Sequence, residues 1–154
     1  MIDRSNFRPP SKSRRGLLIP LAAMTFVGLP LAPTYADGPT DSYFFNEAGV
    51  CTLIVDFSKQ KSELDRLGAE QRRASLARTL ISSFRQQGGA KCPHVPSVRA
   101  LAVYIPGVDS YGRPKFGSRV NLLKLEAPAE AFNSTAAEQV VSLAHLNGFK
   151  VESY

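Results

Sequence analysis

The chain has 154 residues, of which 44% are hydrophobic and 21% charged, so it provides enough material for one domain and excludes a long multidomain array. Its formal net charge is +6, but five basic residues and one acid lie within the first 36 positions. The rest of the chain carries 14 basic residues against 12 acidic ones, a net charge of +2, and this near balance excludes a nucleic-acid partner recognised through global charge.

The first 36 residues have the three regions of a secretory signal. Residues 1–15 are basic, Gly16 to Ala32 is apolar and uncharged, and Thr34-Tyr35-Ala36 provides small residues at the two positions that a signal peptidase reads. We therefore expect residues 1–36 to be a signal peptide that is cleaved before Asp37. The alternative is an uncleaved anchor, although the apolar run falls short of the roughly 20 residues that span a bilayer and contains two prolines.

The basic region contains Ser13-Arg14-Arg15-Gly16-Leu17-Leu18, which resembles the twin-arginine export motif of bacteria. Leu17 stands where that motif usually has Phe, and Ile19 where it often has Lys. The resemblance implies export of a protein that has already folded. Paired arginines also occur in general secretory signals, so both export routes stay open.

The segment after the signal, residues 37–49, is rich in Gly, Pro, Asp, Ser and Thr, and predicts a flexible lead-in whose only apolar spot is Tyr43 to Phe45. The next run, Val50 to Phe57, is β-branched and mostly apolar, which predicts a buried strand. A single domain is therefore expected over residues 50–154.

Two helices are expected after this strand. Ser58 to Gln87 has helical composition, with Gly68 as a break and Gly88-Gly89 as the stop. The second helix is expected over Thr135 to Leu146, ended by Asn147-Gly148. The proposed buried stripe of this second helix consists of Ala137, Val140, Val141 and Ala144.

Alternating residues predict strands over Val98 to Ile105 and Arg119 to Ala127, with a further strand near Phe149 to Glu152. The predicted fold class is α+β: a small antiparallel sheet with two helices on one face, in the split βαβ (ferredoxin-like) order β-α-β-β-α-(β). In that order the strand of residues 98–105 is separated from the strand of residues 50–57 by a third strand.

Cys51 and Cys92 are the only two cysteines, and an even number in an exported chain predicts one disulfide. Cys92-Pro93-His94 looks like the opening of the dithiol motif of periplasmic oxidoreductases, but Val95 stands where the second cysteine belongs. A structural disulfide is therefore expected rather than a redox centre.

The sequence contains no strong catalytic motif and no metal-ligand spacing, so neither a metal nor a cofactor is expected. His94 and His145 are each isolated in the sequence. His145 lies near the end of the second expected helix, where the helix dipole favours its protonated form. A small periplasmic hydrolase built on His94 and Asp109 remains the alternative function, and it requires these two side chains to meet.

The connection from Pro106 to Gly117 is a long hairpin loop that combines aromatic and basic residues with turn-forming ones. Tyrosine and arginine offer large contact areas and several donors at low entropic cost, which is typical of binding surfaces. The alternative is a long turn that only keeps its polar groups in water. The candidate binding residues are Tyr104, Asp109, Tyr111, Arg113 and Lys115.

These features favour a periplasmic or secreted accessory protein of a bacterial cell envelope, without catalytic activity. Its expected partner is an envelope protein or an anionic polymer, contacted through residues 104–116. Contact with a membrane is expected only through the signal segment before cleavage.

Overall fold

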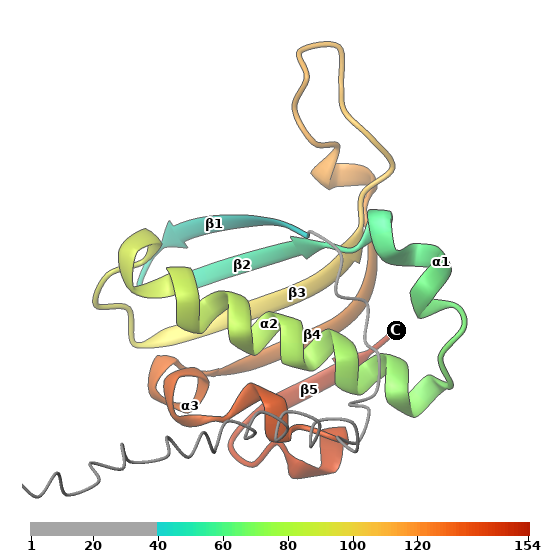
Figure 1. Cartoon of the computed structure of the whole chain (residues 1–154). Helices are drawn as coiled ribbons and strands as arrows, with labels where there is room; N and C mark the ends of the chain where they lie inside the picture. Colours follow the sequence, from blue (N-terminus) through green and yellow to red (C-terminus); the bar gives the residue numbers. More distant parts are fainter. Residues whose placement is uncertain (1–39) are drawn as a thin grey trace, which may run out of the picture. The chain divides into compact units, whose positions relative to one another are not determined.

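The structure is a computed structural model that describes residues 40–154; the expected signal peptide, its cleavage site and the twin-arginine-like motif lie outside the described residues. The fold is α+β, with a five-stranded sheet (Figure 1). The strands are β1 (Asp41–Glu47), β2 (Val50–Asp56), β3 (Ser97–Tyr104), β4 (Val120–Pro128) and β5 (Lys150–Ser153), and the helices are α1 (Lys61–Leu64), α2 (Ala69–Lys91) and α3 (Ala129–Ser134).

The sheet is mixed, with spatial order β1-β2-β3-β4-β5. β2 and β3 run parallel, and the other three neighbouring pairs are antiparallel. The expected antiparallel sheet and split order are therefore not what the structure has, because the first two predicted strands are direct neighbours. α2 makes the crossover between them, as parallel strands require, and no third strand is inserted.

The expected disulfide is confirmed: Cys51 in β2 is joined to Cys92 at the end of α2, with a Cα–Cα distance of 5.9 Å. Both cysteines are buried. Because β2 and β3 are adjacent, the chain returns from α2 to β3 directly beside Cys51. The disulfide therefore ties the crossover helix to the sheet at the point where that helix ends.

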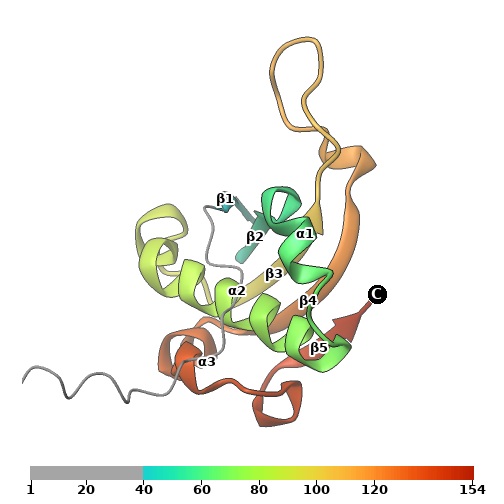
Figure 2. The same ribbon diagram turned by 45° about the vertical axis from the view of Figure 1, so that its right-hand side comes forward.

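The main core lies between one face of the sheet and the helices. α2 runs across this face, as Figures 1 and 2 both show. Its buried residues pack with alternate residues of the strands and with Phe132 of α3. The central contributions come from Leu53, Val55, Leu76, Leu80, Ile81, Ala100, Ala102, Leu123 and Leu125. Residues between these on each strand point to the opposite face, since side chains alternate along a strand.

The opposite face carries a second, smaller cluster. Ile54, Leu101, Val103 and Ile105 are buried there, with Tyr43 and Phe116 packed against them. Phe116 returns from the loop after β3 and meets the rings of Tyr43 and Phe45 edge-on, at centroid distances of 5.0 and 5.6 Å. The segment after β3 therefore anchors itself on this face of the sheet.

The segment expected to be a flexible lead-in contains β1. Tyr43 and Phe45 contact Phe116, and Phe44 packs against the main core, so alternate residues of β1 are used on both faces of the sheet. β1 pairs with β2 over its whole length. The turn between them uses Ala48 and Gly49 with φ of 50° and 80°, in the left-handed region where glycine is favoured.

Two helix predictions also need correction. α2 continues through Gly88 and Gly89 to Lys91. The second helix expected over residues 135–146 does not form: the chain has α3 before it and then two short 3₁₀ turns, Ala137–Gln139 and Leu143–His145. Ala137 and Val140 of the expected stripe are buried, but Val141 is 61% exposed, so the stripe is not continuous.

Candidate binding hairpin

The connection between β3 and β4 forms a hairpin that projects beyond the end of the sheet (Figures 1 and 2). Its stem is closed by backbone hydrogen bonds: Lys115 N–H donates to the Gly107 carbonyl at 3.0 Å, and Asp109 N–H donates to the Arg113 carbonyl at 2.8 Å. Gly107 and Gly112 have φ of 127° and 78°, which glycine adopts without strain. The hairpin is thus an ordered element with its own ladder.

The tip of the hairpin is organised around the carboxylate of Asp109. Its Oδ1 accepts hydrogen bonds from the backbone N–H groups of Tyr111 and Arg113, at 2.8 and 2.9 Å. Its Oδ2 accepts from Arg113 Nε at 3.1 Å. These donors, the Arg113 N–H first among them, hold the pKa of Asp109 below its ordinary value. The ionised carboxylate therefore fixes the turn that presents Tyr111.

The surface of the tip is an aromatic ring with a cation stacked on it. Tyr111 is 81% exposed, and the Arg113 guanidinium lies over its ring at 5.0 Å from the centroid. A single exposed ring is ordinary on a protein surface, but tyrosine and arginine are the residue types enriched where interfaces concentrate their binding energy. The contact with Arg113 and the Asp109 bonds restrict both side chains before any partner binds, which lowers the entropic cost of recognition.

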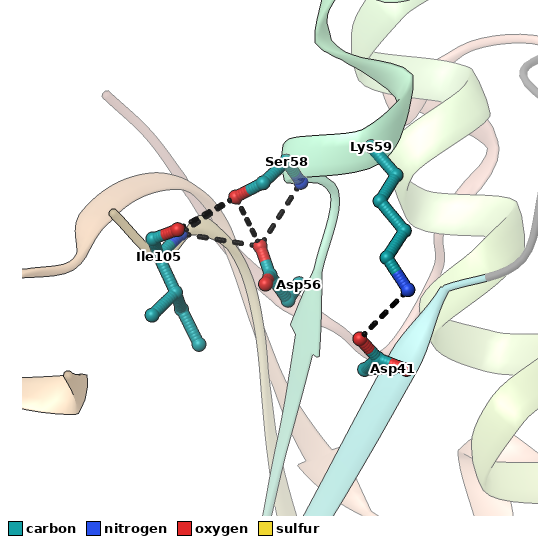
Figure 3. Close-up of polar contacts among 5 residues, drawn as sticks. All are labelled: Asp41, Asp56, Ser58, Lys59 and Ile105. Carbon is teal, nitrogen blue, oxygen red and sulfur yellow. Dashed lines mark hydrogen bonds and ion pairs between the residues drawn. The ribbon is translucent and has the colours of Figure 1, made fainter. Parts of the chain in front are cut away.

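The base of the hairpin is held by a group of polar contacts between the ends of β2 and β3 (Figure 3). Asp56 Oδ1 accepts from Ser58 N–H, Ser58 Oγ–H and Ile105 N–H, at 2.9, 2.6 and 3.1 Å. Ile105 N–H also lies 2.9 Å from Ser58 Oγ. Beside this group, Lys59 pairs with Asp41 at 3.5 Å, which joins the same corner to β1 (Figure 3).

Asp56 and Ser58 were not selected from the sequence as parts of the site, and Ile105 was included only as a member of the segment 104–116. The sequence signal was present, because an Asp two residues before a Ser at a strand end is typical of a side chain that bonds the following backbone N–H. Phe116 and Tyr43 were also missed as contacts, since their pairing joins segments more than 70 positions apart. Short-range patterns carry no information about such pairs.

Tyr104 lies apart from the tip. It ends β3 and is half-buried, with the Lys61 ammonium of α1 over its ring at 5.5 Å from the centroid. Burial raises the pKa of the Tyr104 hydroxyl, and the nearby Asp65 adds to this. Of the five predicted binding residues, the hairpin therefore brings together Asp109, Tyr111 and Arg113, with Lys115 on the stem, while Tyr104 sits at its root.

The hairpin and its root carry a surplus of positive charge. The Arg113 charge is compensated by Asp109, but among the described residues neither Lys115 nor Arg119 takes part in an ion pair. The Arg119 guanidinium donates to the Phe116 carbonyl and to Asn121 Oδ1, both neutral acceptors. Two cations thus remain available to an anionic partner.

The structure does not assemble the hydrolase arrangement. His94 precedes β3 and Asp109 follows it, so the eight residues of β3 separate them. A strand rises about 3.3 Å per residue, which puts the two ends of β3 roughly 23 Å apart. His94 is exposed in the turn before β3, with φ of 59°, and His145 is exposed at the end of a 3₁₀ turn rather than a helix.

Other features of the described chain do not add a site to the hairpin. Within residues 40–154, no three His, Cys, Asp or Glu side chains gather closely enough to hold a metal ion. A shallow open cleft beside α2 is lined by none of the hairpin residues. In the same part of the chain, every helix is too short or too polar to cross a bilayer.

Comparison of the chain with protein-family models, with curated proteins and with solved structures found no significant match.

Proposed function

We propose that this protein is an exported accessory protein of a bacterial cell envelope, periplasmic or secreted, that binds a partner through its projecting hairpin and does no chemistry on it. The partner is an envelope protein or an anionic polymer. The single observation that carries the proposal is the tip, where Asp109 orders a turn that displays Tyr111 and Arg113 to solvent.

The hairpin has the properties of a prepared recognition element. A loop that served only as a connection would not need an internal ladder, three donors on one carboxylate and an aromatic ring held outward. The root adds a further constraint, because Asp56 and Phe116 attach both ends of the hairpin to the sheet. Rigid loops on a scaffold are where binding residues concentrate.

Export is supported by two separate features. The first 36 residues combine a basic region, an apolar region and a small-residue cleavage site. The described domain contains a disulfide between its only two cysteines, and disulfides persist in oxidising compartments outside the cytosol.

The two partner classes make different demands on the hairpin. An anionic polymer would use the uncompensated charges of Lys115 and Arg119, so its binding would weaken steeply with added salt. A protein partner would bury the ring of Tyr111, and its binding would depend much less on ionic strength. The salt dependence of wild-type binding therefore separates the two classes.

The test compares captured partners of four baits: the wild-type protein, Tyr111→Ala/Arg113→Ala, Lys115→Ala/Arg119→Ala, and Tyr154→Ala as the control. Tyr154 is also well exposed, at 64%, but lies at the C-terminus. Each bait is incubated with envelope extract and with purified cell-wall polymer, and bound material is quantified by mass spectrometry and sugar analysis.

We expect Tyr111→Ala/Arg113→Ala to lose at least about tenfold of the specifically bound protein partner, as for a pair of aromatic and arginine anchors, while Tyr154→Ala retains it. Equal capture of protein partners by the wild type and this double variant, with both proteins folded, would refute the role of the Tyr111–Arg113 tip. Equal capture of polymer by the wild type and Lys115→Ala/Arg119→Ala would refute the role of the hairpin charges.

A further inference from the structure

β1 is an edge strand with few of the features that usually protect an edge, its only charges being Asp41 and Glu47 at the two ends. It has seven residues, no proline, no lysine and no interruption in its register with β2. The opposite edge differs, because β5 has four residues and begins with a lysine. Long regular edges present unpaired backbone groups that can pair with another strand, and natural proteins usually block them.

The backbone groups that β1 leaves unpaired follow from the neighbouring ladders. Phe57 N–H donates to the Val103 carbonyl, so the backbone N–H and C=O groups of Phe57 point toward β3. Because these groups alternate in direction along a strand, those of Val55, Leu53 and Cys51 also point toward β3. The residues between them turn theirs toward β1, and their partners there are Asp41, Tyr43, Phe45 and Glu47. The backbone groups of Ser42, Phe44 and Asn46 therefore point away from the sheet.

These outward groups have no partner within residues 40–154. Neither the backbone nor the side-chain hydrogen bonds of the described residues include an acceptor or donor for Ser42, Phe44 or Asn46 beyond the pairing of β1 with β2. Phe45, next to them, leaves 39% of its surface exposed on the face opposite the helices. An incoming strand would find three residues ready for a ladder and an aromatic surface beside it.

The sequence of β1 fits a second copy of itself. An antiparallel pairing centred on Phe44 aligns all seven residues, opposes Ser42 to Asn46 of the other copy, and opposes Tyr43 to Phe45. Cross-strand aromatic pairs on one face stabilise antiparallel strands. The acids at the ends, Asp41 and Glu47, would face each other, which is unfavourable, but Lys59 pairs with Asp41 at 3.5 Å and compensates its charge.

We propose that two copies of this protein associate through β1, antiparallel and centred on Phe44, so that their sheets become one continuous sheet. The two-fold axis passes midway between the two Phe44 residues and is perpendicular to the sheet. Because the hairpin follows β3 at the end of the sheet where β1 begins, the two hairpins then lie at opposite ends of the dimer, and the dimer offers two copies of the same binding element.

The association is tested by sedimentation velocity over a concentration series, with all variants purified in the same processed form. The variant Asn46→Pro removes an outward N–H and leaves the bonds between β1 and β2 intact. We expect the wild type and Asn46→Ala to dimerise and Asn46→Pro to raise the dissociation constant at least about tenfold. A monomeric wild type, or unaltered dimerisation of a folded Asn46→Pro, would overturn the proposal.

A crosslinking test fixes the register and does not depend on the stability of the proline variant. In the double variant Asp41→Cys/Glu47→Cys each new thiol lies directly opposite its partner in the other copy, within the range of a disulfide. The native cysteines are already paired. We expect a covalent dimer from the double variant and none from either single variant. Crosslinking of a single variant to the same extent, or a monomeric double variant under oxidation, would contradict this register.

Discussion

At the scale of single residues, Asp109 determines the conformation of the hairpin tip. Its pKa is held below the ordinary value of 3.8, first by the Arg113 backbone N–H and then by the Tyr111 N–H and the Arg113 side chain. A carboxyl whose pKa is lowered by folding stabilises the folded form fully above its ordinary value and loses that effect as the pH falls through the lower, folded value.

We therefore expect the tip to be ordered at neutral pH and to lose its order only below about pH 3.8. Amide resonances of Tyr111 and Arg113 followed by NMR through an acid titration will report this. In Asp109→Ala, which removes the acceptor of both backbone N–H groups, the same resonances should show the disordered tip at neutral pH and no titration, while the amides of β2 and β3 stay unchanged. An ordered tip in Asp109→Ala would contradict this role of the carboxylate.

Asp56 has a larger effect on stability because it serves both strand ends. Asp56→Ala removes the acceptor of Ser58 N–H, Ser58 Oγ–H and Ile105 N–H in a partly buried place. Hydrogen bonds to a charged group contribute about 1.5–3 kcal/mol, so we expect the free energy of unfolding to fall by about 2–3 kcal/mol. Urea denaturation measures this change.

The matched control for Asp56 is Asp65→Ala. Asp65 pairs with Lys61 four residues earlier, and both side chains are about half exposed or more. Exposed pairs of this kind contribute little, so the loss should stay within about 0.5 kcal/mol. An equal fall in the free energy of unfolding for Asp56→Ala and Asp65→Ala would show that the contacts of Asp56 contribute no more than an exposed ion pair.

At the scale of elements, two adjacent glycines of α2 should respond to alanine in opposite directions. A Cβ at Gly88 would fall on the ring of Phe84, which is buried and packs against Phe132, whereas a Cβ at Gly89 meets nothing within 4 Å. Gly88→Ala should destabilise by about 1–3 kcal/mol through overpacking. Gly89→Ala should stabilise by roughly 0.5–1 kcal/mol, because alanine favours the helix.

Thermal and urea unfolding of both alanine variants measure these effects. Stabilisation by both substitutions would mean that the Phe84 ring moves aside at little cost.

The same glycines show what local sequence patterns miss. A Gly-Gly pair is a common helix stop, but here Gly88 is needed because Phe84 packs one turn earlier, and the helix continues to Lys91. That reason lies in a side-chain contact and not in the propensity of glycine. The start of the helix after Gly68, by contrast, was predictable, since Gly68 occupies the cap with an extended backbone.

The strands differ in how far the sequence determines them. The β-branched run of β2 and the alternation of β3 and β4 predicted strands correctly, because burial on one or both faces leaves a periodic pattern. β1 was not predicted, because only its three central residues, Tyr43 to Phe45, are aromatic and the polar residues on either side leave no alternating pattern. The segment 135–146 was mistaken for a helix, although Ser142 instead caps a single 3₁₀ turn by accepting from Ala144 N–H.

The candidate site was predictable only in part. The tip residues Asp109, Tyr111 and Arg113 were selected from residue type and turn chemistry, which are local properties. Whether these residues bind a partner stays a prediction. The root contacts of Asp56 with Ile105 and of Tyr43 with Phe116 join distant segments, so they become visible only once the strand order is known.

At the scale of the whole molecule, the strand order explains why one disulfide suffices. The split order expected from the sequence is not the observed one, because the pairing of strands is decided by the crossover helix and the shared core rather than by any one strand. With β2 and β3 adjacent, Cys51 meets Cys92 directly where the crossover ends. The bridge closes a separation of 41 residues that contains α1 and α2.

Reduction of this bridge should therefore destabilise the entire domain and not only one end of α2. For a loop of this size the chain-entropy model gives about 4 kcal/mol, a large part of the stability of a small domain. Urea unfolding with and without a reductant measures the effect. The double variant Cys51→Ala/Cys92→Ala should match the reduced protein and be insensitive to reductant; a reductant effect in that variant would point to another cause.

This dependence connects the stability of the domain to the compartment in which it folds. If residues 1–36 direct export, the protein recovered from the envelope should begin at Asp37 and contain no free thiol, as N-terminal sequencing and thiol labelling will show. A chain beginning at Asp37 and made in a reducing cytosol should instead have both thiols free and be degraded faster, because its unfolded fraction is larger. Equal lifetimes in the two compartments, with the thiols in different states, would mean that the disulfide is not what stabilises the protein in the cell.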